Sequence, residues 1–351
     1  MNTIFSAYSD GLARVRRAPA ILFGIYALAL VFTALPGLAL RDTLESAIGS
    51  GRDAAVMANG VSLEWWDQFG ETATGLGRTF SPTIIGFGAV LDNVSRILDG
   101  HALPAAAAVL VAASMVGWLF LAGGILDRLA RNRPLRAAAF FGACGTYFPR
   151  FLRLGLLGLA GYAVVIGVLH PWLFGTVWDA LTRDMTVERN AFLVNLALYA
   201  VFGLALITWN VVLDYAKIRA VIEDRRSMIG ALVAAWRFVV THPADAAGLY
   251  VVNALGFLVV VGLYALVAPG AGRPGWTMWL GFAVGQVYVL LRLAVKLVFW
   301  ASQVALFDRS LAHHAHTAPP VPVWPESAAA EAITNAATIS AVSGAVEKRP
   351  G

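Results

Sequence analysis

The sequence contains few charged residues and only one cysteine. Aspartate, glutamate, lysine and arginine make up 13% of its 351 residues, whereas 59% are hydrophobic. Soluble domains ordinarily carry about 25% charged residues, so this composition excludes an ordinary soluble globular protein. Because Cys144 is the only cysteine, the chain can form neither an internal disulfide nor a metal site built from several cysteines.

The chain also lacks the short motifs of common enzyme sites. G-x-S-x-G, H-E-x-x-H, the P-loop and the dinucleotide-binding glycine motif are all absent. We therefore expect neither an enzyme nor a bound cofactor or metal. The net charge is +5, but the basic residues are spread over short connections between apolar segments, which argues against a nucleic-acid partner.

Six apolar segments are long enough to cross a bilayer as helices, which need about 20 residues each. They cover residues 18–40, 104–126, 152–172, 191–213, 246–268 and 276–307. The sequence therefore predicts an all-α integral membrane protein with six transmembrane helices. Arginine and lysine are concentrated at the N-terminus and in the second-to-third and fourth-to-fifth connections, so the positive-inside rule predicts that both termini are cytoplasmic (N-in/C-in). The composition, rich in Ala, Arg and Gly, is typical of a GC-rich bacterium, so we expect the bacterial cytoplasmic (inner) membrane.

An internal repeat organises the six segments. The second, fourth and sixth segments each end in two apolar residues followed by an aspartate: Asp127, Asp214 and Asp308. A mixed apolar and basic stretch and then a proline precede each odd-numbered segment: Pro19, Pro149 and Pro243. The separation from Pro149 to Asp214 equals that from Pro243 to Asp308, and the first unit is longer in its external loop. We infer three tandem helical hairpins.

The repeats divide the chain into units 1–127, 128–214 and 215–310. The first unit contains an external insertion at about 41–103, and residues 311–351 are expected to form a disordered cytoplasmic tail because their composition cannot bury a core. Each unit should begin with an amphipathic helix at the inner headgroup level, covering residues 5–17, 135–148 and 228–242. The proline should end that helix, and the repeated aspartate should cap or pair at a helix end. Parallel repeats also suggest a pseudo-threefold bundle.

The external insertion is rich in acidic residues. Helices are expected at 63–69, where Trp65 and Trp66 would lie at headgroup depth, and at 82–98. Glu64, Asp67 and Glu71 have helical spacing, which suits a solvated face better than acid/base chemistry or cation binding. The insertion is also a candidate docking surface for a protein partner.

The sixth segment carries the clearest candidate binding site. At 3.6 residues per turn, one face presents Gly281, Gly285, Tyr288, Arg292, Lys296 and Gln303. A charge at mid-bilayer costs about 2.5–3.5 kcal/mol on insertion scales, so this face should contact protein, a cavity or a ligand. The glycine pair predicts close packing against a neighbouring helix.

No Asp or Glu lies inside the six predicted segments, so Arg292 and Lys296 lack an obvious counter-ion. As structural residues they would snorkel or bond backbone carbonyls; as functional residues they would meet a lipid phosphate, an anionic substrate or an aqueous cavity. With neighbouring polar groups included, the candidate ligand-binding residues are Arg292, Lys296, Tyr288, Gln303 and Asn253.

The leading hypothesis is a protein that binds or translocates an anionic amphiphile, such as a lipid headgroup, through a cavity lined by the sixth helix. Membrane lipids are then its partners. The alternative is a structural or accessory subunit that scaffolds a complex through the external loop or the cytoplasmic tail. An enzyme acting at the outer face through Glu64, Asp67 or Glu71 is favoured less than either.

Overall fold

The computed structural model describes residues 2–49, 62–79, 95, 97–98, 101, 105–268 and 275–317. These residues are 91% helical and include no strand. Six helices are long and apolar enough to cross a membrane, as the sequence predicts, which is the character of a multi-pass membrane protein. The chain divides after Phe307 into two compact units, and the features described below belong to the first unit unless stated otherwise.

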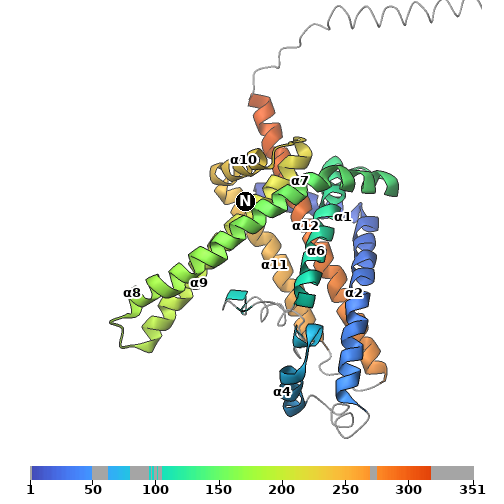
Figure 1. The fold of residues 1–351 in the computed structure, drawn as a ribbon. Coiled ribbons are helices and arrows are strands. Elements are labelled where there is room, and N and C mark those ends of the chain that lie inside the picture. Colours follow the sequence, from blue (N-terminus) through green and yellow to red (C-terminus); the bar gives the residue numbers. More distant parts are fainter. Residues whose placement is uncertain are drawn as a thin grey trace, which may run out of the picture. The chain divides into compact units, whose positions relative to one another are not determined.

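The long helices extend beyond the predicted apolar segments (Figure 1). They are α2 (Pro19–Ile48), α6 (Ala105–Arg131), α7 (Ala137–Val164), α9 (Glu188–Ile222), α11 (Pro243–Val267) and α12 (Trp276–Thr317). The third span continues from α7 through η2 (Val165–Leu169), η3 (Trp172–Val177) and α8 (Trp178–Thr182). Part of the predicted loop and part of the predicted tail are therefore helical, because α2 continues to Ile48 and α12 to Thr317. The rest of the tail, and most of the predicted 82–98 helix, lie outside the described residues.

Shorter helices precede two of the spans. Helix α1 (Asn2–Arg16) leads into α2, and α10 (Met228–Thr241) leads into α11. Pro19 and Pro243 occupy the first positions of α2 and α11, where a missing backbone N–H costs no helical hydrogen bond. In the external insertion, α4 (Leu63–Thr72) and η1 (Gly75–Thr79) are described.

The second repeat, residues 128–214, departs from this pattern. Pro149 lies inside α7, so the predicted break between an amphipathic helix and the third span is wrong. Close packing against α6 holds α7 on both sides of the proline: before it, a Cβ at Gly124 would lie 2.6 Å from the sulfur of Cys144, and after it, a Cβ at Gly155 would lie 2.8 Å from Leu119 of α6. Packing of this kind compensates for the backbone hydrogen bond that proline cannot make.

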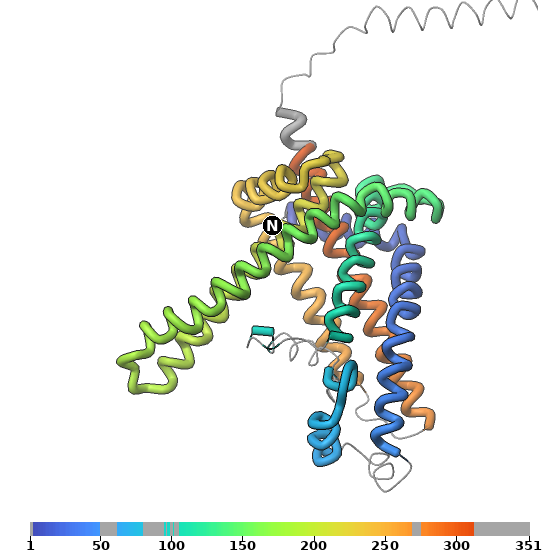
Figure 2. Tube along the Cα trace, viewed as in Figure 1, coloured from blue at the N-terminus to red at the C-terminus, as the bar shows by residue number. Residues whose placement is uncertain are grey.

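The third span and α9 form a hairpin that diverges from α2, α6, α11 and α12 (Figure 2). Leu173, Leu198 and Phe202 are buried where the two arms of this hairpin pack together. This hairpin does not run alongside the other four long helices (Figure 2). The structure therefore does not show the pseudo-threefold bundle that the repeats suggest, and that bundle stays a prediction.

The main core lies at the end of the spans where α1, α6, α7, α9, α10 and α12 meet. Tyr215, Phe151 and Phe307 are among its largest fully buried side chains. Helix α1 approaches α12 so closely that a Cβ at Gly11 would lie 2.6 Å from the backbone nitrogen of Ser302. Away from this core the spans expose large apolar side chains such as Leu266 (85%). Surfaces of this kind suit contact with lipid acyl chains rather than water.

Arginines at the ends of the spans bond the exposed carbonyls of neighbouring helices. Arg14 donates to the carbonyl of Leu129 at 3.0 Å and joins α1 to α6, and Arg219 donates to the carbonyl of Ala234 at 2.7 Å and joins α9 to α10. Leu129 lies in the last turn of α6, where carbonyls have no helical partners, so a cation there is favourable.

The connection between α9 and α10 is held by a second group of ion pairs. Glu223 accepts hydrogen bonds from Arg219 and Arg225; burial raises the pKa of Glu223, but these two hydrogen bonds outweigh it and keep the pKa below its ordinary value. Asp224 accepts a hydrogen bond of 2.5 Å from Arg150, which lowers the pKa of the Asp224 carboxyl and ties the connection to α7.

We predict that Gly124→Val lowers the free energy of unfolding by about 1–3 kcal/mol, because the added atoms would overlap Cys144 and Phe140 of α7. Thermal unfolding in mild detergent measures the effect. Gly117→Val is the matched control on the same helix, since a Cβ there meets no atom within 4 Å. Equal losses in the two variants would show that the α6–α7 contact is not tight.

Candidate functional site

A cavity of about 540 Å³ lies between α2, α6, α11 and α12. Its walls are mostly apolar, with Ala29, Trp118 and Phe257 among them, and its charged groups are Arg292 and Lys296 of α12. The two cations are four residues apart and therefore project from one face of the helix, as the sequence predicts. Both side chains are exposed in the structure, consistent with an accessible cavity wall.

Lys296 has a counter-ion that the sequence reasoning missed. Helix α9 continues well past the predicted end of the fourth span, and this extension places the Asp214 carboxylate, 2% exposed, where it attracts the Lys296 ammonium. Asp214 also accepts a hydrogen bond of 2.8 Å from Lys217. The sequence shows Asp214 as one of the repeated aspartates. Because Asp214 lies just beyond the apolar segment, the sequence does not indicate that it lies near the sixth helix.

Trp300 completes the cluster around Asp214. Its ring lies 5.0 Å from the Lys296 ammonium and 5.6 Å from that of Lys217, so both cations contact the aromatic face. The buried Trp300 Nε1 lies near the carboxylate without reaching regular hydrogen-bond geometry. Asp214 therefore pairs with Lys217 and also attracts the Lys296 ammonium.

Arg292 is placed differently. Among the described residues, it forms neither a hydrogen bond nor an ion pair, while its side chain lines the cavity. A guanidinium offers five donors and remains charged, so an anion entering the cavity would find it available.

A chain of polar groups leads away from the cavity. Tyr250 lines the cavity, and its hydroxyl accepts a hydrogen bond of 3.3 Å from the Asn210 side chain. The Asn210 carbonyl oxygen accepts in turn from the Tyr162 hydroxyl at 3.4 Å. These contacts connect the cavity wall on α11 to α9 and α7.

The other three candidate residues lie elsewhere. The Tyr288 ring stacks on Tyr264 with centroids 4.2 Å apart, beside a separate apolar cavity of about 280 Å³ between α11 and α12. Asn253 donates to Ser302 at 3.0 Å, and Gln303 is buried at 2% exposure. Tyr288 and Gln303 are about 22 Å apart along the helix axis, too far to share one cavity of this size with Arg292 and Lys296.

Two of the repeated aspartates lie in the first compact unit, and each forms a local ion pair. Asp127 accepts a 2.7 Å hydrogen bond from Arg131, as Asp214 does from Lys217. Asp308 belongs to the second compact unit. A Cβ at Gly285 would meet no atom within 4 Å, so this glycine does not pack closely against a neighbouring helix; close packing at Gly281 stays a prediction.

The external insertion presents its acids to the surface. Glu64, Asp67 and Glu71 are exposed, whereas Trp65 and Phe69 are buried on the opposite side of α4 with their rings stacked 5.0 Å apart. No group of three or more His, Cys, Asp or Glu side chains in the described part of the chain is placed to hold a metal ion.

No known family model matches the chain, and comparisons with curated proteins and with solved structures find no match.

We expect Asp214→Asn to lower the free energy of unfolding by about 1–3 kcal/mol, because Lys217 loses a charge-assisted hydrogen bond and Lys296 loses its counter-ion. Asp127→Asn is the matched control: Asp127 is also buried, but its partner Arg131 is half exposed and can be hydrated. Denaturation in mild detergent compares the two. A smaller loss for Asp214→Asn than for Asp127→Asn would contradict the role given to Asp214.

Proposed function

We propose that this multi-pass membrane protein binds or translocates an anionic amphiphile, such as a lipid with a phosphate headgroup, through the cavity lined by α12. The observation that carries the proposal is the placement of Arg292 and Lys296 on the wall of an otherwise apolar cavity. Cations at such depth are costly unless they meet an anion or water, and an apolar wall suits a hydrophobic chain.

The balance of charge supports an anionic ligand. Lys217 pairs with the Asp214 carboxylate, which also attracts Lys296, and Arg292 has no acidic partner among the described residues. None of the described residues that line the cavity is acidic. A bound phosphate or carboxylate would therefore compensate charge that the described protein groups leave unbalanced.

Both cations belong to the third repeat, residues 215–310. Counting back from the repeated aspartates, the positions that match Arg292 and Lys296 are Val111 and Met115 in α6, and Leu198 and Phe202 in α9. An apolar residue at each matching position favours a role for the two cations that is specific to α12, rather than a structural role common to the repeats.

We also propose three tandem hairpins, with both termini on the cytoplasmic side of a bacterial inner membrane. The arginine-rich ends of α1, α6 and α9 support this orientation by the positive-inside rule. The short helices α1 and α10, each followed by a proline that begins a span, support the repeat in the first and third units.

The proposal predicts that Arg292→Leu with Lys296→Leu removes bound anionic lipid. Native mass spectrometry of the full chain, released from mild detergent, should detect an anionic adduct on the wild type, and the occupancy of the adduct that depends on these two cations should be at least about tenfold lower on the double variant. Two controls accompany it. The charge-conserving Arg292→Lys with Lys296→Arg should retain the adduct, and so should Arg183→Leu with Arg189→Leu, which removes the same charge from exposed positions.

An adduct that is equally abundant on both forms would refute the proposed site. A wild type that carries no anionic adduct in the presence of added lipid would do the same, and would favour the alternative role as an accessory subunit.

A further inference from the structure

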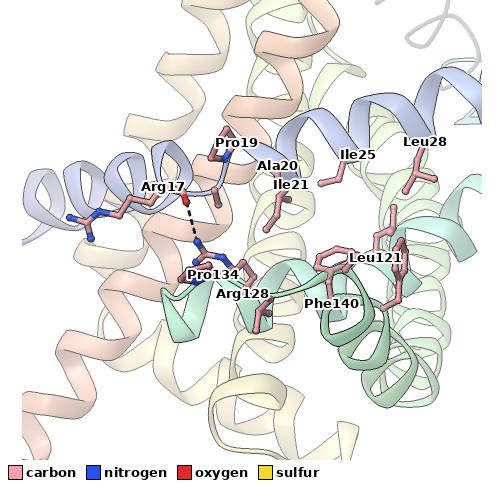
Figure 3. Close-up of a pocket in the computed structure, with 15 residues that line it drawn as sticks. Arg17, Pro19, Ala20, Ile21, Ile25, Leu28, Leu121, Arg128, Pro134 and Phe140 are labelled. Atoms are coloured by element: carbon pink, nitrogen blue, oxygen red, sulfur yellow. Dashed lines mark hydrogen bonds between the residues drawn. The ribbon is translucent and has the colours of Figure 1, made fainter.

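A second cavity, of about 340 Å³, lies between the start of α2 and the α6–α7 hairpin (Figure 3). Ile21, Ile25 and Leu28 lie along one wall, and Leu121 and Phe140 face them from the other side (Figure 3). Most of this lining is apolar. The cavity is separate from the one lined by α12 and shares no residue with it.

Arg128 lies at the Pro19 end of this cavity (Figure 3). The residue is 6% exposed, and its Nη2 donates to the carbonyl of Arg17 at 3.1 Å. Its Nη1 is buried and has no hydrogen-bond partner among the residues that the structure describes. A buried guanidinium donor without an acceptor is costly, so a ligand that supplies an oxygen there would be stabilised.

Other positive groups lie at the same end. Arg17 also lines the cavity and is exposed. Pro19 and Ala20, the first residues of α2, line it too, so the positive end of a 30-residue helix dipole adds to the charge of the two arginines. No acidic residue is among the residues that line the cavity.

The direction of the cavity matches the direction of a lipid in a bilayer. Helix α2 begins at Pro19 and α6 ends at Arg131, so the arginines lie at a span end, where headgroups are found. From Ile21 to Leu28 the apolar wall runs about 10 Å along α2 toward the middle of the span. A headgroup at Arg128 would therefore place its acyl chain against the apolar wall.

We propose that this cavity binds an anionic phospholipid, with its phosphate on Arg128 and an acyl chain along α2. The lipid would contact α2 on one side and the α6–α7 hairpin on the other, and so would link them. This site does not depend on the proposed function of the α12 cavity.

Native mass spectrometry of the full chain with added phosphatidylglycerol, phosphatidylcholine or inorganic phosphate tests the site. Arg128→Gln should lower phosphatidylglycerol occupancy at this site at least about tenfold, because the charge-assisted hydrogen bonds to phosphate are lost. Arg133→Gln, a nearby exposed arginine, is the matched control and should leave occupancy unchanged. Phosphatidylcholine and inorganic phosphate should bind much more weakly than phosphatidylglycerol, the first because it has no net negative charge and the second because it has no acyl chain.

A second variant keeps the test independent of folding defects at Arg128. Gly24 lines the cavity, and a Cβ there meets no atom within 4 Å, so Gly24→Leu should fill the cavity without a clash and reduce lipid binding. Gly37→Leu, also on α2 and also unobstructed, is its control. Undiminished phosphatidylglycerol binding in Arg128→Gln or in Gly24→Leu would overturn the proposal, as would inorganic phosphate binding as tightly as the lipid.

The two sites can be told apart in the same experiment. The Arg292→Leu with Lys296→Leu variant should keep the adduct that depends on Arg128, and Arg128→Gln should keep the adduct that depends on the α12 cations. A variant that loses no adduct identifies which of the two proposals has failed.

Discussion

Asp214 is a carboxylate with 2% exposure that pairs with Lys217 at 2.8 Å and attracts Lys296, and the arrangement around the larger cavity depends on it. A buried charge is tolerated only when partners offset its desolvation, so Lys217 and Lys296 are held near it. Lys296 is thereby fixed at the junction of α9 and α12, beside Trp300. Arg292, one turn away, has no such partner among the described residues and remains available to a ligand.

The span ends follow the same rule of compensation. Arginines at helix ends bond carbonyls of neighbouring helices, as Arg14 does at Leu129 in the last turn of α6 and Arg219 does at Ala234 within α10. These bonds join helices that are distant in the sequence, where the buried core also lies. Arg128 takes part in this network through the Arg17 carbonyl but keeps one donor unpaired, which separates it from arginines whose role is only structural.

Both cavities combine apolar walls with unbalanced positive charge. One is lined by α12 deep in the helical region, and the other opens at the start of α2. In each, the cations contributed by the described residues outnumber the acids available to them. The same chemistry, a phosphate with an attached hydrocarbon chain, satisfies both.

The number and approximate position of the spans were predictable because a chain in lipid must satisfy its backbone hydrogen bonds within each helix, and this requires long apolar segments. Pro19 and Pro243 marked two helix starts correctly, since proline fits the first turn. The spacing of Arg292 and Lys296 placed them on one face, because helical periodicity is a local property.

Contacts between helices were decided only in the tertiary structure. Pro149 stays inside α7 because α6 packs against it, and Asp214 meets Lys296 because α9 lies beside α12. The unpaired donor of Arg128 likewise depends on how α6 meets the turn between α1 and α2. Helix association in membranes relies on lateral packing and on the depth of each residue, and neither leaves a periodic pattern in the sequence.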